Sequence, residues 1–377
     1  MSHLVFYRKY RPQLFSEITG QESVVRTITN AIEMDRVSHA YLFCGPRGSG
    51  KTTIARLLAK AVNCQNRKGF EPCGKCFSCL DIQKGSAVDL IEIDAASHRG
   101  IDEVRALKEG TRFTPTSSSK KIYIIDESHQ LTKEAANALL KILEEAPSHI
   151  IFILATTEPH KMIATIISRC QRFDFRKLTV PELVKRLELI AKKEGIKIEK
   201  SALELIALNA EGAARDADGI LGQIAAFFSN QDKKITTNEI EDLLGLVDIS
   251  LVSKMTDFII KKDIRGGLTL LNELSEKGRD INEFAKMMTN YLRKVMIVKI
   301  MGEEIKERRS PLMDSILAGL TEEDFDNLKR QANALKEEKL KKYLDLIIEA
   351  QNKMKYSSIS QLPLELAMVE IINPDED

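Results

Sequence analysis

The segment that most limits the fold is residues 45–52, which read GPRGSGKT. They fit the pattern G-x-x-x-x-G-K-[ST], in which glycines let backbone N–H groups close around phosphate oxygens. Residues 40–44, AYLFC, are apolar like a buried strand, and the residues that follow the loop place Ile54, Leu57 and Leu58 at helical spacing. A strand, a glycine loop and a helix in this order predict a parallel α/β sheet with a phosphate site at its carboxyl edge.

The loop predicts nucleotide binding with magnesium. Lys51 is expected to reach the β- and γ-phosphates, and Thr52 to hold Mg²⁺. The residues predicted to bind nucleotide are Gly45, Pro46, Arg47, Gly48, Ser49, Gly50, Lys51, Thr52 and Thr53.

An acidic pair follows a second apolar run, IYII at residues 122–125. Asp126 and Glu127 should lie at the carboxyl end of a strand, beside the phosphates. Asp126 is then placed to hold Mg²⁺, and Glu127 to orient or activate the attacking water. The other interpretation is an acidic pair that caps the next helix, and both interpretations can hold together. A third predicted strand, HIIFILATTEP, ends in Thr156 and Thr157, whose hydroxyls could contact the γ-phosphate or the water.

Four of the six cysteines, Cys64, Cys73, Cys76 and Cys79, read C-x8-C-x2-C-x2-C. Two-residue spacing lets neighbouring sulfurs reach one metal, and the distant cysteine closes the site. Four thiolates with no open position are typical of structural zinc. Four reduced cysteines without metal, or an iron–sulfur cluster, are the alternatives.

Length, charge and hydropathy limit the number of domains, the partners and the location that can be expected. A chain of 377 residues is too long for one compact core. The formal net charge of +1 provides no overall basic field, so DNA binding would need a local basic surface. No apolar run approaches a membrane span, and the first residues, MSHLVFYRKYRP, lack a signal-peptide core. A cytoplasmic protein without membrane contact is predicted.

Seven motifs follow one another along the chain. They are FYRKYRPQLFSEITGQE, the phosphate loop, the four cysteines, DLIEIDAASHRGIDEVR, NALLKILEEAP, LATTEP and SRC. In these motifs the chain resembles the tau/gamma subunits of the bacterial DNA polymerase III clamp loader, a family of AAA+ ATPases. The similarity is dense from residue 7 to about 177 and thinner to about 245. Because the sequence ends at INPDED, it resembles the short, gamma-like form or a longer form cut at this point.

The resemblance implies roles for residues near the nucleotide. Tyr7 and Arg11 belong to the segment that borders the adenine of ATP. Thr157, or else Thr156, takes the sensor-one place. Arg215 is similar to sensor two, which reaches the γ-phosphate from the lid. Plain packing is the alternative for Tyr7 and Arg11. For Arg215 the alternative is a pairing with Asp216 or Asp218.

The resemblance also implies a residue that acts between subunits. Arg169 in SRC is similar to the arginine finger, which acts on ATP bound by the neighbouring subunit. An arginine in a surface ion pair is the alternative. For DNA contact, His98 and Arg99 are suggested at a helix start, and Lys141 by family position. Solvated surface charge is the alternative for these residues.

The expected fold is an α/β P-loop AAA+ domain, with a parallel sheet covered by helices on both faces, followed by two all-α domains. The AAA+ domain is expected over residues 1–177, with a zinc module inserted at about 63–81. A helical lid is expected over 178–244, and a helical collar that joins subunits over 245–377.

Local signals place some helix ends in these all-α domains. Gly195 is predicted to end the first lid helix. Ser201 with Glu204, and Thr236 with Glu239, are predicted to form capping boxes.

The function implied is an ATPase motor of the replicative clamp loader within the DNA polymerase III holoenzyme, at replication forks on the nucleoid. ATP, Mg²⁺ and structural Zn²⁺ are the expected cofactors. Expected partners are delta-type and delta-prime-type subunits, further copies of the chain, the sliding clamp and primer–template DNA. The alternatives are a non-hydrolysing scaffold subunit and another AAA+ DNA motor, of the helicase or branch-migration type.

Overall fold

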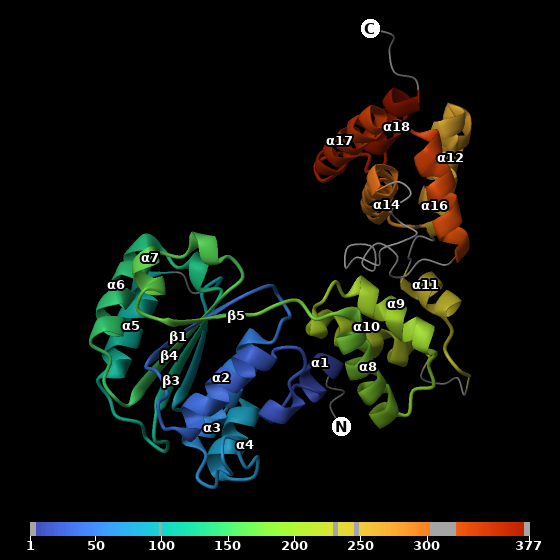
Figure 1. The fold of residues 1–377 in the computed structure, drawn as a ribbon. Helices are drawn as coiled ribbons and strands as arrows, with labels where there is room; N and C mark the ends of the chain where they lie inside the picture. Colours follow the sequence, from blue (N-terminus) through green and yellow to red (C-terminus); the bar gives the residue numbers. More distant parts are fainter. Residues whose placement is uncertain (1–4, 98–99, 229–232, 245–248, 302–321, 373–377) are drawn as a thin grey trace. The chain divides into compact units, whose positions relative to one another are not determined.

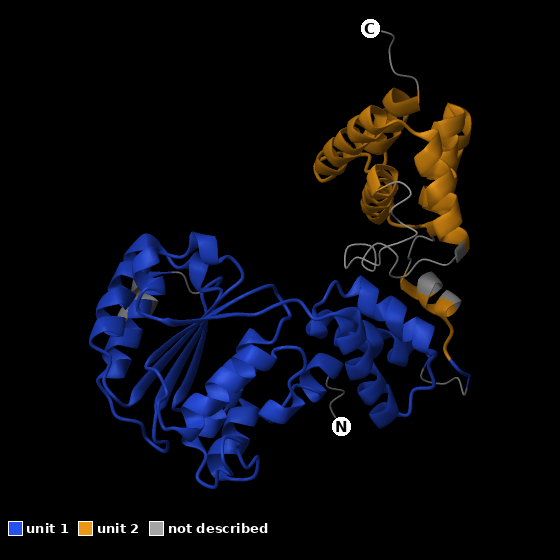
Figure 2. Cartoon of the chain, viewed as in Figure 1, with its two compact units in different colours: residues 1–234 blue, residues 235–377 orange. Residues whose placement is uncertain are grey.

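The computed structural model describes residues 5–97, 100–228, 233–244, 249–301 and 322–372. The chain divides into two compact units, residues 1–234 and 235–377, which Figure 2 distinguishes by colour. Each unit is described by itself. Boundaries between three domains at 177 and 244 remain predictions.

The first unit is built on a five-stranded parallel sheet with the order β2-β3-β4-β1-β5. Its strands are β1 (Ala40–Cys44), β2 (Leu90–Asp94), β3 (Lys121–Asp126), β4 (Ile150–Thr156) and β5 (Gln171–Asp174). The three apolar runs noted in the sequence form β1, β3 and β4, which lie in the middle of the sheet. The two edge strands are more exposed, as is usual at the margin of a sheet.

Alternating residues of the strands face two separate cores. Tyr41 and Phe43 pack with α2 (Glu22–Glu33) and α3 (Lys51–Asn63), whereas Leu42 packs with α5 (Ile101–Thr111) and α6 (Lys133–Glu144). Figure 1 shows these helix pairs on opposite faces of the sheet. The predicted fold class, a parallel sheet covered on both faces, is confirmed.

Short elements complete the first domain. The chain enters through α1 (Phe6–Lys9) and the 3₁₀ turn η1 (Phe15–Glu17), and α4 (Phe77–Lys84) follows the cysteine segment. After β3 and β4 come η2 (Ser128–Gln130), η3 (Pro159–Lys161) and α7 (Ala164–Ile167).

The lid consists of α8 (Val180–Glu194), α9 (Lys200–Asn209) and α10 (Ala214–Phe227). Helix α8 begins with a capping box between Thr179 and Glu182 and ends at Gly195, as predicted for its end. The capping box predicted at Ser201 is wrong. Helix α9 starts two residues earlier than predicted, with Glu199 as its N-cap, so Ser201 lies inside the helix.

The second unit is all helical where it is described. It contains α11 (Thr237–Leu244), α12 (Ile249–Lys261), α13 (Ile264–Glu276), α14 (Ile281–Met301), α16 (Glu322–Ala334), α17 (Glu337–Met354) and α18 (Leu362–Ile372). Helix α11 is preceded by Thr236, whose backbone N–H donates to Glu239, the reciprocal bond of a capping box. Apolar faces of α12, α13, α14, α16, α17 and α18 share one core. Among the described helices, none combines the length and hydropathy needed to cross a bilayer.

Candidate nucleotide site and metal centre

A pocket lies where the phosphate loop, the end of β3, the N-terminal segment and the lid meet. It is lined by Tyr7, Arg11, Pro12, Ile18, Thr19, Arg47, Gly48, Ser49, Gly50, Lys51, Thr52, Thr53, Asp126, Glu127, Leu178, Arg186, Ala214, Arg215 and Asp218. Most residues predicted to bind nucleotide are therefore brought together. Gly45 and Pro46 form the base of the loop and contribute backbone carbonyls to it.

The loop joins β1 to α3, so the N–H groups of the first turn of α3 face the pocket. Gly48 takes a left-handed conformation, with φ of 76°, and a Cβ there would lie 2.8 Å from Cβ of Ala213, the N-cap residue of lid helix α10. The Lys51 ammonium donates to the carbonyl oxygens of Gly45 (2.8 Å) and Pro46 (2.9 Å). Burial lowers the pKa of Lys51, while the nearby Glu127 and Asp126 act in the opposite direction.

The acidic pair connects the loop to β4. The Thr52 hydroxyl donates to Oδ2 of Asp126 at 2.9 Å. The Thr157 hydroxyl donates to Oε2 of Glu127 at 2.8 Å, so Thr157 acts on the pocket through Glu127. Glu127 has a positive φ of 48°, and although it precedes η2, its side chain makes no capping bond. The alternative of a helix-capping acidic pair is therefore wrong.

Two residues after the acidic pair have roles that sequence reasoning did not assign. The Ser128 hydroxyl is buried and donates to the carbonyl of Ala155 in β4 at 3.0 Å. Nδ1 of His129 lies 3.0 Å from the Thr156 hydroxyl and 3.5 Å from Oε2 of Glu127. The contacts with Ala155 and Thr156 cross from the end of β3 to β4. Ser128 and His129 stand beside the acidic pair in the run DESH, but nothing in that run indicates that they contact β4.

The lid side of the pocket is held by aromatic and ionic contacts. The Arg215 guanidinium lies 4.8 Å from the centre of the Tyr7 ring. Arg186, which the sequence did not single out, forms two bonds to the buried Asp218, at 2.9 and 2.6 Å. Asp218 is thus the partner of Arg186, and the pairing of Asp218 with Arg215 is wrong. Burial raises the pKa of Asp218, and the Arg186 guanidinium opposes the rise.

Cations outnumber carboxylates in the pocket lining. The cationic side chains are Arg11, Arg47, Lys51, Arg186 and Arg215, and the acidic ones are Asp126, Glu127 and Asp218. Because Asp218 is already paired with Arg186, the remaining surplus is positive. A phosphate-rich anion suits such a lining.

The remaining predicted residues lie elsewhere. Arg169 follows α7, outside the pocket lining, and forms an ion pair with Glu144 at the end of α6 at 2.5 Å. Lys141 is exposed on α6. His98 and Arg99 lie outside the described residues, so the structure places neither of them.

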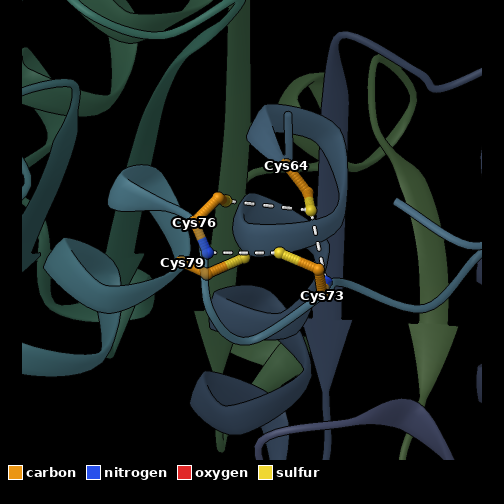
Figure 3. Close-up of side chains that lie close together, drawn as sticks. All are labelled: Cys64, Cys73, Cys76 and Cys79. Carbon is orange, nitrogen blue, oxygen red and sulfur yellow. Dashed lines mark hydrogen bonds between the residues drawn. The ribbon is translucent and has the colours of Figure 1, made fainter. Parts of the chain in front are cut away.

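The four clustered cysteines converge, as Figure 3 shows. Their sulfur atoms all lie within 4.8 Å of one another. Four sulfurs at zinc-bonding distance stand roughly 3.8 Å apart, so this donor set fits a tetrahedral Zn²⁺ site closely. Backbone N–H groups of Lys75 and Cys76 donate to Sγ of Cys73 and lower its pKa to about 6. Burial instead raises the pKa of Cys64 and of Cys79.

The two sites lie at opposite ends of one helix. Helix α3 starts at the phosphate loop, and Cys64 is its C-cap residue. With a rise of about 1.5 Å per residue, its 13 residues separate the sites by roughly 20 Å. The cysteine centre is therefore remote from the phosphates.

The first unit combines a parallel sheet with a glycine loop that opens a helix, an acidic pair at a strand end, and a helical lid. Together these features define a P-loop ATPase of the AAA+ class. Three family profiles match in order along the chain. They are described as DNA polymerase III, delta subunit (residues 20–179), DNA polymerase III clamp loader subunit, ATPase lid domain (182–230), and DNA polymerase III subunits gamma and tau domain III (235–376).

Individual relatives agree with the profiles. DNA polymerase III subunit tau of Bacillus subtilis is 40% identical over 375 residues, which are 98% of this chain and 63% of that protein. DNA polymerase III subunit gamma of Buchnera aphidicola is 33% identical over 373 residues, 99% of each chain. The chain therefore belongs to the DNA polymerase III subunit gamma/tau family. It spans less than two thirds of the length of the Bacillus relative.

Among solved structures, the Thermotoga maritima RuvB Holliday junction branch migration motor is similar with a TM-score of 0.48 and 21% identity. The match covers 66% of this chain and 79% of that one. A similarity of this size supports no conclusion about function.

Proposed function

We propose that this chain is the ATPase motor subunit of a bacterial replicative clamp loader, which loads the sliding clamp onto primer–template DNA at replication forks. Membership of the gamma/tau family supports a place in a multi-subunit clamp loader. The observation that carries the catalytic part is that Lys51, Thr52, Asp126 and Glu127 line one cationic pocket. A scaffold that only binds nucleotide would not need Glu127 held in that pocket by Thr157.

Each of these side chains has a defined task. Lys51 would bind the β- and γ-phosphates of ATP, and Thr52 with Asp126 would hold Mg²⁺. Magnesium, when bound, neutralises charge on the transferring phosphoryl group. Glu127 would orient or activate the attacking water. Its bond from Thr157 supports a sensor role for that threonine, because movement at the end of β4 would be passed to Glu127.

The adenine and lid side of the site rests on other residues. Tyr7 and Arg11 would border the base, and Arg215 would reach the γ-phosphate from the lid. The stacking of Arg215 on Tyr7 supports this pairing of roles, since one movement of the lid would shift both.

Arg169 is proposed to act on the neighbouring subunit. It lies outside the pocket of its own chain, on a surface beside Glu144. An arginine supplied from a second subunit makes hydrolysis depend on assembly. We propose delta-type and delta-prime-type subunits and further copies of this chain as neighbours in a ring. Lys141 and Arg99 are proposed to contact primer–template DNA.

The cysteine centre is proposed to bind structural Zn²⁺. Metal analysis of the purified chain should find about one zinc per chain, and cobalt substitution should give the absorption of a tetrahedral thiolate site. Iron with sulfide would support the iron–sulfur alternative, and the absence of bound metal would support free thiols.

Steady-state ATP hydrolysis tests the motor function. The purified chain is assayed alone and then with partner subunits, primed DNA and clamp, with Arg169→Ala beside the wild type. Stimulation by DNA and clamp is expected, and Arg169→Ala should reduce the stimulated rate about 10³-fold. Hydrolysis that ignored DNA and clamp and survived the substitution would contradict the clamp-loader role and the finger assignment. It would leave another AAA+ motor as the explanation.

A further inference from the structure

The segment over residues 6–19, which we call the N-terminal strap, reaches the helical lid with its first part. The Tyr10 hydroxyl donates to Glu194 of α8, and Nζ of Lys9 pairs with the same carboxylate at 2.6 Å. Arg186 donates to the carbonyl of Tyr10 at 3.1 Å. Figure 1 shows α1 beside the lid helices. This end of the strap is therefore fixed to the lid by charged contacts.

Two stretches of the strap, one on each side of η1, form a wall of the nucleotide pocket. Arg11, Pro12, Ile18 and Thr19 all line it. Arg11 is partly buried, and burial lowers the pKa of its guanidinium. A wall of this kind presents a rigid surface to a ligand only when the chain on both sides of it is held.

The part of the strap between these two wall stretches, at η1, is held by the cysteine segment. The Glu71 carboxylate accepts from the backbone N–H of Phe15 (2.9 Å) and of Ser16 (2.8 Å), which open η1. The Phe15 ring packs edge-on against Phe70, with ring centres 6.4 Å apart. Glu71 lies between Cys64 and Cys73, two residues before the latter. Its place therefore depends on the loop that those two cysteines close.

We propose that the cysteine centre sets the affinity of the nucleotide pocket, with Glu71 as the positioning residue that connects it to the N-terminal strap. This inference rests on the proposed nucleotide binding. With metal bound, the loop of residues 64–73 holds Glu71 under η1, and Arg11 and Pro12 keep their places in the pocket wall. Without metal the loop is freed, the two N–H groups lose their carboxylate, and the wall loosens. The chemistry at Glu127 does not change.

The first test measures the strap directly. In amide hydrogen exchange, Glu71→Ala should accelerate exchange at Phe15 and Ser16 about tenfold, because their N–H groups lose a charged acceptor. Glu71→Gln, which keeps an acceptor oxygen without the charge, should fall between Glu71→Ala and the wild type. The control is Lys75→Ala, an exposed residue of the same cysteine segment whose side chain has none of the strap contacts described above. Unchanged exchange in Glu71→Ala would overturn the proposal whether or not the chain binds ATP.

The second test measures nucleotide affinity with and without metal. Glu71→Ala should weaken ATP binding about five- to tenfold at equilibrium, while kcat at saturating ATP stays within about twofold. Chelation by a zinc-selective reagent in excess Mg²⁺ should weaken binding by the wild type to a similar extent, and should add little in Glu71→Ala, since both changes release the same contact.

The outcomes separate this proposal from the proposed function. If chelation weakened ATP binding equally in wild type and Glu71→Ala, the coupling would not pass through Glu71. If the wild type bound ATP and neither change affected the affinity, the proposal would be wrong and the nucleotide site would stand. A wild type that bound no ATP would remove the proposed function, and the hydrogen-exchange test would still decide the connection of Glu71 to the strap.

Discussion

The two ends of helix α3 carry sites built on opposite principles. At its start, the phosphate loop presents backbone N–H groups and the positive end of the helix dipole, which suit an anion. At its end, Cys64 begins a group of four sulfurs that suits a cation. The first site depends on main-chain conformation, and the second on side chains that converge from a short loop.

This difference means that the two sites should fail in different ways. An extra methyl group is enough to disturb a site made of backbone, whereas a site made of thiolates tolerates backbone changes and depends on sulfur. The site at the start of α3 should control the rate of the reaction. The site at its end should control the folding stability of the protein and, through Glu71, its affinity for ATP. Four substitution experiments test this division of roles.

The largest effect is expected at the start of the helix. Glu127→Gln should reduce ATP hydrolysis by the assembled complex about 10²- to 10⁴-fold, because an amide cannot accept a proton from water. Nucleotide affinity should stay within about twofold, since the phosphate contacts are untouched. Steady-state ATPase and equilibrium binding check the two parts, with Glu134→Gln, an exposed glutamate of α6, as the control. Full activity in Glu127→Gln would remove Glu127 from the catalytic assignment.

The next effect is expected at the other end of the helix. Cys76→Ser should prevent tight metal binding and lower the free energy of unfolding by about 3 kcal/mol. The value of kcat at saturating ATP should remain within about twofold, because the sulfurs lie far from the phosphates. Denaturant titration, metal analysis and ATPase measure the three quantities. The division between the two ends would break if Cys76→Ser reduced kcat as strongly as Glu127→Gln.

A matched pair of glycines compares the two ends directly. Gly48 and Gly74 both have positive φ, of 76° and 65°, but a Cβ at Gly48 meets Ala213 at 2.8 Å, whereas at Gly74 nothing lies within 4 Å. Both alanine variants should lose about 1–2 kcal/mol of stability through backbone strain. Only Gly48→Ala should also weaken ATP binding, by about tenfold, because the loop must move away from the lid. Equal ATP affinity in the two variants would show that the loop tolerates the added methyl.

The smallest effect is expected between the sheet and the lid, at Glu182. Arg176 beside this carboxylate lowers its pKa from 4.5 to about 2, helped by the capping bonds of Thr179. A depressed pKa in the folded state stabilises the protein above the unfolded value, and this contribution is lost as pH falls from about 4.5 towards 2. Because the group is partly exposed, Glu182→Gln should cost only about 1 kcal/mol at pH 7.

The pH dependence of that difference is the measurement. The unfolding free energies of wild type and Glu182→Gln should converge as the pH is lowered to 3. Loss of metal at low pH affects both proteins alike and cancels in the difference. A gap between the two proteins that did not depend on pH would assign the effect to packing rather than to charge.

The central parts of this molecule could be predicted because their signals are local. Three apolar runs predicted the middle strands, the loop motif predicted the pocket, and the cysteine spacing predicted the cluster of four sulfurs. Strand β5 could not be predicted in this way, since only Phe173 of its four residues is buried. An edge strand has little need for an apolar pattern.

The contacts that organise the pocket were harder to predict because they join distant parts of the chain. Arg186 and Asp218 are 32 residues apart, and Tyr10 and Glu194 are 184 apart. Each of these residues alone looks like an ordinary surface residue on a helix. The pairing of Glu71 with Phe15 had no sequence signal either, since its acceptor is a side chain and its donor is backbone.

Glu127 occupies a left-handed backbone conformation that glycine adopts without strain. A side chain in this conformation costs about 1–2 kcal/mol. Glu127→Gly would remove that strain together with the carboxylate, and the lost bond from Thr157 would offset part of the gain. Activity and heat resistance are therefore expected to change in opposite directions at this residue. At the residue that is proposed to activate the attacking water, folding stability by itself would favour a different amino acid.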